Sequence, residues 1–176
     1  MEDEQARILE VLQLAVRMEI DGMEFYEEAS RKSSNKLAED LFEQLADEED
    51  VHRRKFEQIY DAIKKRQEWP DIEPPSEEGA QLRSLFAQAT EALGTKATVA
   101  KSELEAIQVA MNMEIESYNL YRLRSEESTL PLEKRFYEAL AGEERQHHLA
   151  LSDTYEYLCD PAGWFTKKEH WSLDGA

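Results

Sequence analysis

The chain has 176 residues, a formal net charge of −18 and a charged fraction of 34%. Its few glycines and prolines and its many acidic and aliphatic residues are typical of a protein built from long helices, and the length fits one domain. An acid excess of this size argues against binding nucleic acid or anionic lipid through a broad basic surface.

Two further features concern the cellular location. No apolar stretch reaches the roughly 18 residues of a membrane helix, and the acidic N-terminus, Met1–Glu4, does not resemble a signal peptide. The single cysteine, Cys159, cannot form an intrachain disulfide. We therefore expect no membrane partner and a reducing, cytoplasmic location.

Four long segments show apolar residues at spacings of three and four, which predicts four amphipathic helices. We expect them to span about 4–32, from just after Asn35 to about 66, about 98–127 and about 131–158. Ser33–Asn35 forms the first break, because Ser and Asn favour the N-cap position. Pro131 marks the start of the last helix.

Residues 67–97 separate the two pairs of helices. The prolines at the start of this segment exclude a regular helix there, and Leu82–Leu93 then predicts a short helix that ends near Gly94. We expect one long crossover. Residues 1–159 would thus form a four-helix bundle, and residues 160–176 a C-terminal tail whose aromatic residues, Trp164, Phe165 and Trp171, dock onto its surface.

The predicted core stripes are interrupted by charged residues in a repeated pattern. A Glu-x-x-His motif occurs at Glu49 and at Glu144, with both side chains of each motif on one helical face. Each motif glutamate lies 30 residues after a lone glutamate, Glu19 or Glu114. The whole pattern repeats with an offset of 95 residues. Taken alone, Glu19 could also lie at the edge of a rotated stripe.

The spacing predicts that these side chains meet. Glu19 lies 15 residues before Ser34 and Glu49 lies 15 residues after it, so both are roughly 22 Å from the turn in an antiparallel hairpin. The second half has the same spacing around Thr129. Two hairpins joined by a long crossover make an all-α, ferritin-like four-helix bundle.

Four core carboxylates need compensating charge, because like charges at short range raise one another's pKa. Two divalent cations would balance them, with His52 and His147 as neutral ligands. This donor set suits iron or manganese better than a structural zinc site, although adventitious zinc is possible. We expect Glu49 and Glu144 to bridge the ions and Glu19 and Glu114 to bind one ion each, although the sequence alone does not decide which glutamates bridge.

Other acidic and histidine residues near the motifs are weaker candidates. Glu48 and Glu143 also face the motif histidines at a spacing of four residues, but the 30-residue rule favours their neighbours, so we expect flanking charges there. We expect His148 to be solvated and His170, in the tail, not to be a ligand.

The motifs resemble the rubrerythrin branch of the ferritin-like superfamily over residues 5–158. The residues that carry the resemblance are Glu19 with Phe25-Tyr26, Glu49-x-x-His52, Glu114 with Tyr121, Glu144-x-x-His147 and the tail segment 160–165. The resemblance implies two iron ions that react with hydrogen peroxide or dioxygen, an external electron donor such as a rubredoxin-type protein, and a homodimer.

The chain departs from that pattern in two places. It contains no Cys-x-x-Cys pair for a rubredoxin domain, and Ser117 stands where full rubrerythrins carry an additional glutamate. The leading interpretation is a di-iron oxidoreductase. The alternatives are a ferroxidase or iron-buffering protein without turnover and a metal-free helical interaction module. Tyr26 and Tyr121 would donate hydrogen bonds or relay an electron, or else be core aromatics with satisfied hydroxyls.

Overall fold

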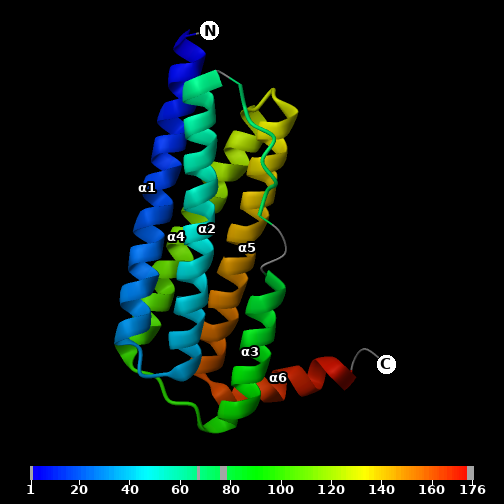
Figure 1. The fold of residues 1–176 in the computed structure, drawn as a ribbon. Coiled ribbons are helices and arrows are strands. Elements are labelled where there is room, and N and C mark those ends of the chain that lie inside the picture. Colours follow the sequence, from blue (N-terminus) through cyan, green and yellow to red (C-terminus); the bar gives the residue numbers. More distant parts are fainter. Residues whose placement is uncertain (1, 67, 76–78, 174–176) are drawn as a thin grey trace.

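The computed structural model describes residues 2–66, 68–75 and 79–173, and helices are the regular secondary structure of this part of the chain. Figure 1 shows long helices running side by side, with a shorter helix against them and another across their lower end. The helices are α1 (Glu2–Lys32), α2 (Lys36–Arg66), α3 (Gly79–Leu93), α4 (Lys101–Glu127), α5 (Pro131–Cys159) and α6 (Pro161–Leu173), with a 3₁₀ turn at Gly94–Lys96. No described helix is long and apolar enough to cross a membrane.

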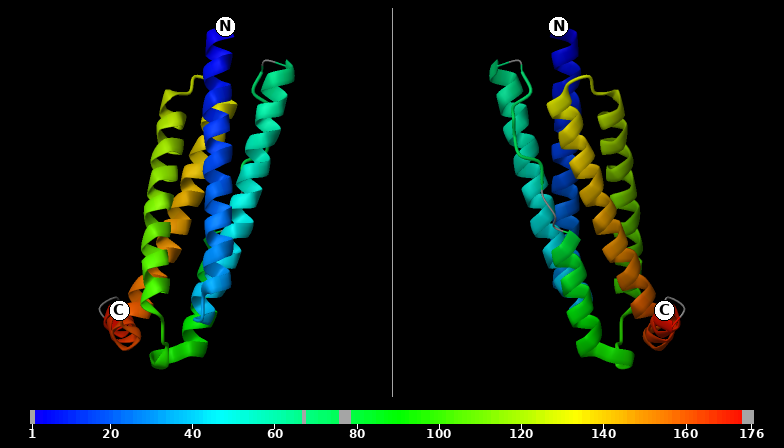
Figure 2. Two further views of the ribbon diagram at one scale, coloured as in Figure 1. Left: turned by 90° about the vertical axis from the view of Figure 1, so that its left-hand side faces the viewer. Right: turned by 90° about the vertical axis from the view of Figure 1, so that its right-hand side faces the viewer.

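The long helices form two antiparallel hairpins, α1 with α2 and α4 with α5 (Figure 2). The predicted break at Ser33–Asn35 is confirmed. The Asn35 side-chain oxygen accepts a hydrogen bond from the Ala38 backbone N–H at 3.1 Å and so caps α2. Helix α5 begins at Pro131, as predicted, because proline has no N–H to leave unsatisfied in the first turn.

The crossover joins the hairpins along the outside of α2 and α5 (Figure 1). Trp69 is buried there, with its ring centroid 5.7 Å from that of Tyr137. Helix α3 starts three residues before the predicted Leu82 and ends at Leu93. The next residue, Gly94, has a φ of +60°, the left-handed conformation that favours glycine. The Tyr157 hydroxyl donates to the Gly94 carbonyl at 2.5 Å, which ties the crossover to α5.

The tail contains α6, which the sequence analysis did not predict. Asp160 separates it from α5 and accepts a hydrogen bond from the Gly163 N–H at 2.9 Å. Trp164 packs against Phe86 and Tyr157, with ring centroids 5.4 and 6.4 Å apart, so this aromatic residue docks as expected. The side chains of His170 and Trp171 lie outside the described part of the structure.

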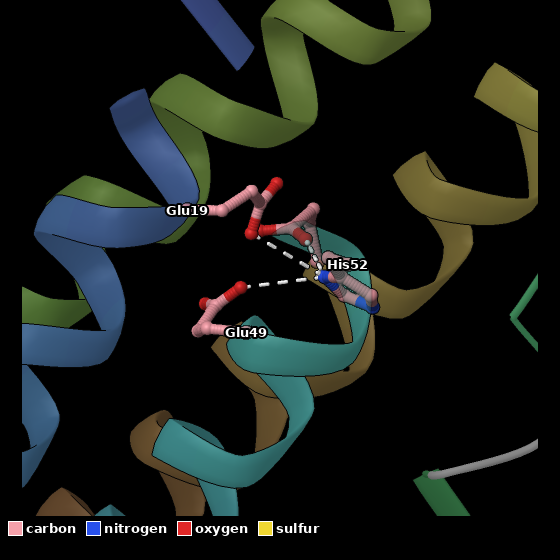
Figure 3. A group of neighbouring side chains, drawn as sticks. Glu19, Glu49 and His52 are labelled. Atoms are coloured by element: carbon pink, nitrogen blue, oxygen red, sulfur yellow. Dashed lines mark ion pairs between the residues drawn. The ribbon is translucent and has the colours of Figure 1, made fainter. Parts of the chain in front are cut away.

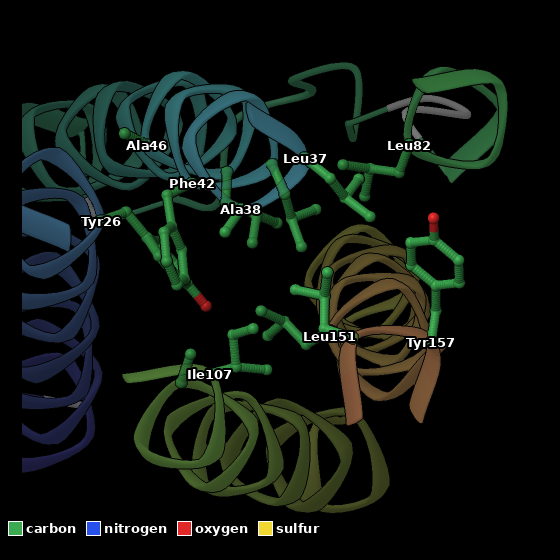
Figure 4. Close-up of a cluster of buried hydrophobic side chains, with 13 residues drawn as sticks. Tyr26, Leu37, Ala38, Phe42, Ala46, Leu82, Ile107, Leu151 and Tyr157 are labelled. Atoms are coloured by element: carbon green, nitrogen blue, oxygen red, sulfur yellow. The ribbon is translucent and has the colours of Figure 1, made fainter. Parts of the chain in front are cut away.

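Buried apolar side chains form two clusters, one on each side of the bundle's middle. The cluster near the Ser33–Asn35 turn (Figure 4) contains Tyr26, Leu37, Ala38, Leu41, Phe42, Leu45, Ala46, Leu82, Ile107, Ala110, Leu151, Tyr157 and Leu158. The other contains Leu12, Ala15, Phe56, Ile59, Ile63, Trp69, Tyr121, Phe136, Tyr137, Leu140 and Ala141. Burying each large apolar side chain contributes about 1.5–3 kcal/mol, so the two clusters carry most of the stability.

Glu103, near the start of α4, joins the two hairpins at the lower end. Its carboxylate accepts hydrogen bonds from the backbone N–H groups of Ser34, Asn35 and Ala100 at 2.8–3.0 Å, and from the Ser34 hydroxyl at 2.9 Å. Burial alone would raise the pKa of Glu103, but these hydrogen bonds outweigh it and lower the pKa.

We expect Glu103→Ala to lower the free energy of unfolding by about 2–4 kcal/mol, because it leaves several buried N–H donors unsatisfied. The pKa of Glu103 is lower in the folded protein than its usual 4.5. Its contribution is therefore present above that pH and fades as the pH falls further. Urea unfolding of the metal-free protein at neutral and acid pH measures both effects. Glu105→Ala, an exposed site on the same helix, is the control, and an equal loss in both variants would contradict the assignment.

Candidate metal centre

Six charged or imidazole side chains meet in the middle of the bundle, between the two apolar clusters. Helix α1 supplies Glu19, α4 supplies Glu114, and α2 and α5 each supply one Glu-x-x-His pair. Each of the six residues is 4% exposed or less. The structure thus places at one level the side chains that the 30-residue spacing had predicted to meet.

The six side chains divide into two overlapping groups. Glu19, Glu49, His52 and Glu144 offer ligand atoms within 4.8 Å of one another, and so do Glu49, Glu114, Glu144 and His147. Glu49 and Glu144 belong to both groups. Two adjacent cations would therefore share these two carboxylates, which agrees with the bridging role expected for them.

The histidines point their Nδ1 atoms at the carboxylates. His52 Nδ1 lies 3.5 Å from a Glu19 oxygen and 3.3 Å from Glu49 Oε2 (Figure 3). His147 Nδ1 lies 3.3 Å from a Glu114 oxygen and 3.7 Å from Glu49 Oε1. Glu49 therefore directs one oxygen toward each histidine, as a carboxylate between two cations would.

Several inward atoms have no hydrogen-bond partner among the described residues although they are buried. They are Glu49 Oε2, Glu114 Oε2, Glu144 Oε1 and the Nδ1 atoms of both histidines. Buried polar atoms normally have hydrogen-bond partners, and a site for a bound ion is one reason for an exception. Oxygen and imidazole nitrogen donors facing a common centre fit two divalent cations of the iron or manganese type.

Two buried tyrosines hold the outer glutamates by crossed hydrogen bonds. The Tyr26 hydroxyl on α1 donates to Glu114 on α4, and the Tyr121 hydroxyl on α4 donates to Glu19 on α1. Burial and the adjacent carboxylates raise the pKa of both tyrosines well above the usual value. Both therefore remain protonated donors, and each reaches the glutamate of the other hairpin rather than that of its own helix.

Burial and close contacts raise the pKa of some carboxyl groups in the cluster and lower that of another. Burial and the charge of Glu49 raise the pKa of Glu19 to about 8. Burial and the neighbouring carboxylates also raise the pKa of Glu144 well above its usual range. Burial opposes ionisation of Glu49 as well, but its close contacts with Glu19 and both histidines lower its pKa.

Burial and the neighbouring carboxylates act in opposite directions on the pKa of the two histidines. Burial disfavours a charged imidazole, but the surrounding carboxylates outweigh burial and raise the pKa of His52 and His147 well above 6.5. Without metal, the cluster therefore compensates its negative charge by holding extra protons on carboxyl and imidazole groups.

Sequence reasoning did not foresee the contacts of three nearby residues. Glu48, expected only as a flanking charge, is buried, and its Oε2 atom lies 2.7 Å from His147 Nε2. Glu143 is buried as well, within 4.8 Å of both Glu48 and His147. His148, expected to be solvated, is half-buried, with Nδ1 3.3 Å from the Met111 carbonyl. The four-residue spacing to the histidines was the available signal, but that spacing does not reveal contact with the opposite hairpin.

A family model of rubrerythrin matches residues 10–155, which include all six residues of the cluster. The chain belongs to the rubrerythrin family. No curated protein and no solved structure gives a significant match. The rubrerythrin assignment and the buried carboxylate–histidine cluster together fit a two-metal protein, typically one of iron.

A surface pocket of about 290 Å³ reaches this rubrerythrin cluster from outside. It opens between α4 and α5, and Glu114 and Glu144 contribute to its lining. The other lining residues are Ile115, Tyr118, Asn119, Arg145 and His148. A small molecule could therefore approach two of the six side chains without disrupting either hairpin.

We expect metal binding to release protons at pH 7. Glu19 has a pKa of about 8, so it carries a proton below that pH, and a cation must displace it. Apparent metal affinity should therefore increase as the pH rises from 6 to about 8. Calorimetric titration with Mn²⁺ in buffers of different ionisation enthalpy measures the released protons. A binding enthalpy that is the same in every buffer would exclude proton release.

Proposed function

We propose that this protein is a di-iron oxidoreductase that reduces hydrogen peroxide, or dioxygen, with electrons from an external donor. The observation that carries the proposal is the pair of overlapping donor groups that share Glu49 and Glu144 inside the buried core. Manganese suits the same donors, and zinc could enter adventitiously during expression.

Each part of the chain has a definite task in this proposal. Two ferrous ions would supply the two electrons that, with two protons, convert hydrogen peroxide into two water molecules. Glu49 and Glu144 would hold the ions side by side. The hydrogen bonds from Tyr26 and Tyr121 would fix the outer carboxylates and leave their remaining oxygens directed at the ions. The apolar clusters would exclude bulk water from either side.

In this proposal the electrons come from another molecule, as the family resemblance implies. A rubredoxin-type protein is the proposed donor. The single free thiol also fits a reducing compartment, so we place the activity in the cytoplasm. We further propose a homodimer, as the family resemblance implies. The proposed function involves neither nucleic acid nor a membrane.

The second candidate is a ferroxidase or iron-buffering protein, which would use the same two donor groups to bind iron. Both functions begin with Fe(II) oxidation, but only the oxidoreductase continues to consume oxidant while a donor is supplied. Storage of mineral would also require a hollow multimeric shell, which light scattering would detect. A metal-free interaction module is the least favoured function, because it gives the buried carboxylates no role.

The decisive experiment mixes anaerobic, Fe(II)-loaded protein with hydrogen peroxide or with dioxygen and follows iron oxidation by absorbance. We expect the oxidation rate to exceed that of Glu114→Ala by at least tenfold, since loss of one ligand disrupts one metal position. Glu116→Ala, an exposed site on α4, should behave as wild type. Repeated turnover with reduced rubredoxin would support the oxidoreductase, and a single turnover would support the ferroxidase. Equal rates in all variants would exclude both.

The pocket between α4 and α5 is the proposed route for the oxidant. Ile115→Trp should fill it and slow the reaction of the Fe(II)-loaded protein with hydrogen peroxide several-fold, without changing its iron content. Leu14→Trp, at an equally exposed site on α1, is the matched control. If both variants react as fast as wild type, the oxidant enters elsewhere.

A further inference from the structure

We propose that Glu48 is a positioning residue for His147, and that its contact with this histidine makes the two metal positions unequal in affinity. The inference rests on the proposed two-metal centre. It concerns the surroundings of the ligands rather than the ligands themselves, since Glu48 faces the side of His147 that points away from the donor groups.

The geometry around His147 assigns a task to each ring nitrogen. Nδ1 faces Glu114 and Glu49, whereas Nε2 lies 2.7 Å from Glu48 Oε2. His147 and Glu48 are both almost completely buried. A proton on Nε2 is therefore donated to the carboxylate, which fixes the tautomer and leaves the Nδ1 lone pair for a cation.

Glu48 is itself held in place. The Gln44 side-chain amide, one turn earlier on α2, donates to Glu48 Oε1 at 2.9 Å. One carboxylate oxygen is thus occupied by Gln44 and the other by His147. This arrangement restricts the rotation of Glu48, and through Glu48 the rotation of the imidazole ring.

The 95-residue repeat predicts an equivalent contact from α5 back to α2, between Glu143 and His52, but neither atom of that pair has a partner among the described residues. Glu143 corresponds to Glu48 and His52 corresponds to His147. Yet Glu143 Oε2 and His52 Nε2 are both buried without a hydrogen-bond partner in the described part of the chain. The sequence supplies a reason, because Gln44 corresponds to Ala139, which has no amide to hold the second carboxylate.

This difference has a direct consequence for metal binding. A carboxylate that accepts the outer N–H of a ligating imidazole orients the ring and increases its basicity. The position formed by Glu49, Glu114, Glu144 and His147 has such a carboxylate, and the position that includes His52 does not. We therefore expect the His147 position to fill first and the His52 position to bind more weakly.

Glu48, Glu143 and His147 could instead hold a third cation, since their ligand atoms lie within 4.8 Å of one another. That arrangement would require a Nε2 atom without its proton while Nδ1 binds another cation. The 2.7 Å contact between Nε2 and a carboxylate favours a shared proton instead. A hydrogen-bonded pair is therefore the better assignment.

The test is anaerobic titration of the metal-free full-length chain with Co²⁺, followed by visible absorbance and calorimetry. Wild type should bind two ions in two steps, and Glu48→Gln should weaken the tighter step by about 10- to 100-fold. Glu143→Gln is the matched control, because it makes the same change at the equivalent buried position and should leave that step unchanged. Gln44→Ala should have an intermediate effect.

A second measurement does not depend on any variant. In wild-type protein loaded with Zn²⁺ and labelled with ¹⁵N-histidine, one ligand Nε2 proton should be shifted downfield by its carboxylate partner and the other should not. Two equally shifted protons would overturn the inequality. Glu48→Gln should reduce the single shift if the assignment to His147 is correct.

The remaining outcomes separate this inference from the function on which it rests. Equal weakening by Glu48→Gln and Glu143→Gln would overturn the unequal positions alone. A third equivalent of Co²⁺ that both variants abolish would overturn the hydrogen-bonded pair in favour of a cation site. A wild-type chain that binds no Co²⁺ would overturn the proposed metal centre and this inference together.

Discussion

Four carboxylates buried at one level of the bundle are the constraint on which the rest of the structure depends. Removing such charges from water costs several kcal/mol each unless they are compensated. In the metal-free protein, protons on Glu19, Glu144 and the histidines provide compensation, and two divalent cations would replace them. This polar layer contributes little to the free energy of folding. The apolar clusters on either side contribute most of it, because their large side chains are fully buried.

The polar layer also determines how the two hairpins fit together. Tyr26 and Tyr121 each reach across to a glutamate of the other hairpin, and Glu103 on α4 binds the turn between α1 and α2. These are hydrogen bonds with defined directions, whereas apolar packing tolerates small shifts. The contacts that join the two hairpins therefore also align the candidate ligands. A shift of one hairpin along the other would break both crossed hydrogen bonds.

Much of this arrangement could be predicted from sequence, because helix rise is constant and equal spacing from a turn places residues at equal height. The all-α bundle, its turns and the meeting of the six side chains followed from that rule. The rule does not give the rotation of one hairpin against the other. Glu48 was therefore expected only as a flanking charge, and the tyrosine contacts were not foreseen as crossed. Helix α6 was missed because residues 160–176 were treated as a tail, although the helix begins at Pro161 and proline is favoured in the first turn of a helix.

The two halves of the 95-residue repeat are alike in their candidate ligands but differ in the residues around those ligands. Each hairpin contributes one glutamate and one Glu-x-x-His pair, and the residues three positions after the lone glutamates, Gly22 and Ser117, are both small. Selection for two identical metal positions would preserve equivalent partners around both histidines, yet Gln44 is matched by Ala139. A reaction that removes two electrons from the centre does not require the two positions to be alike. Differences in the second layer of residues can therefore set the order of loading while the six ligands remain the same.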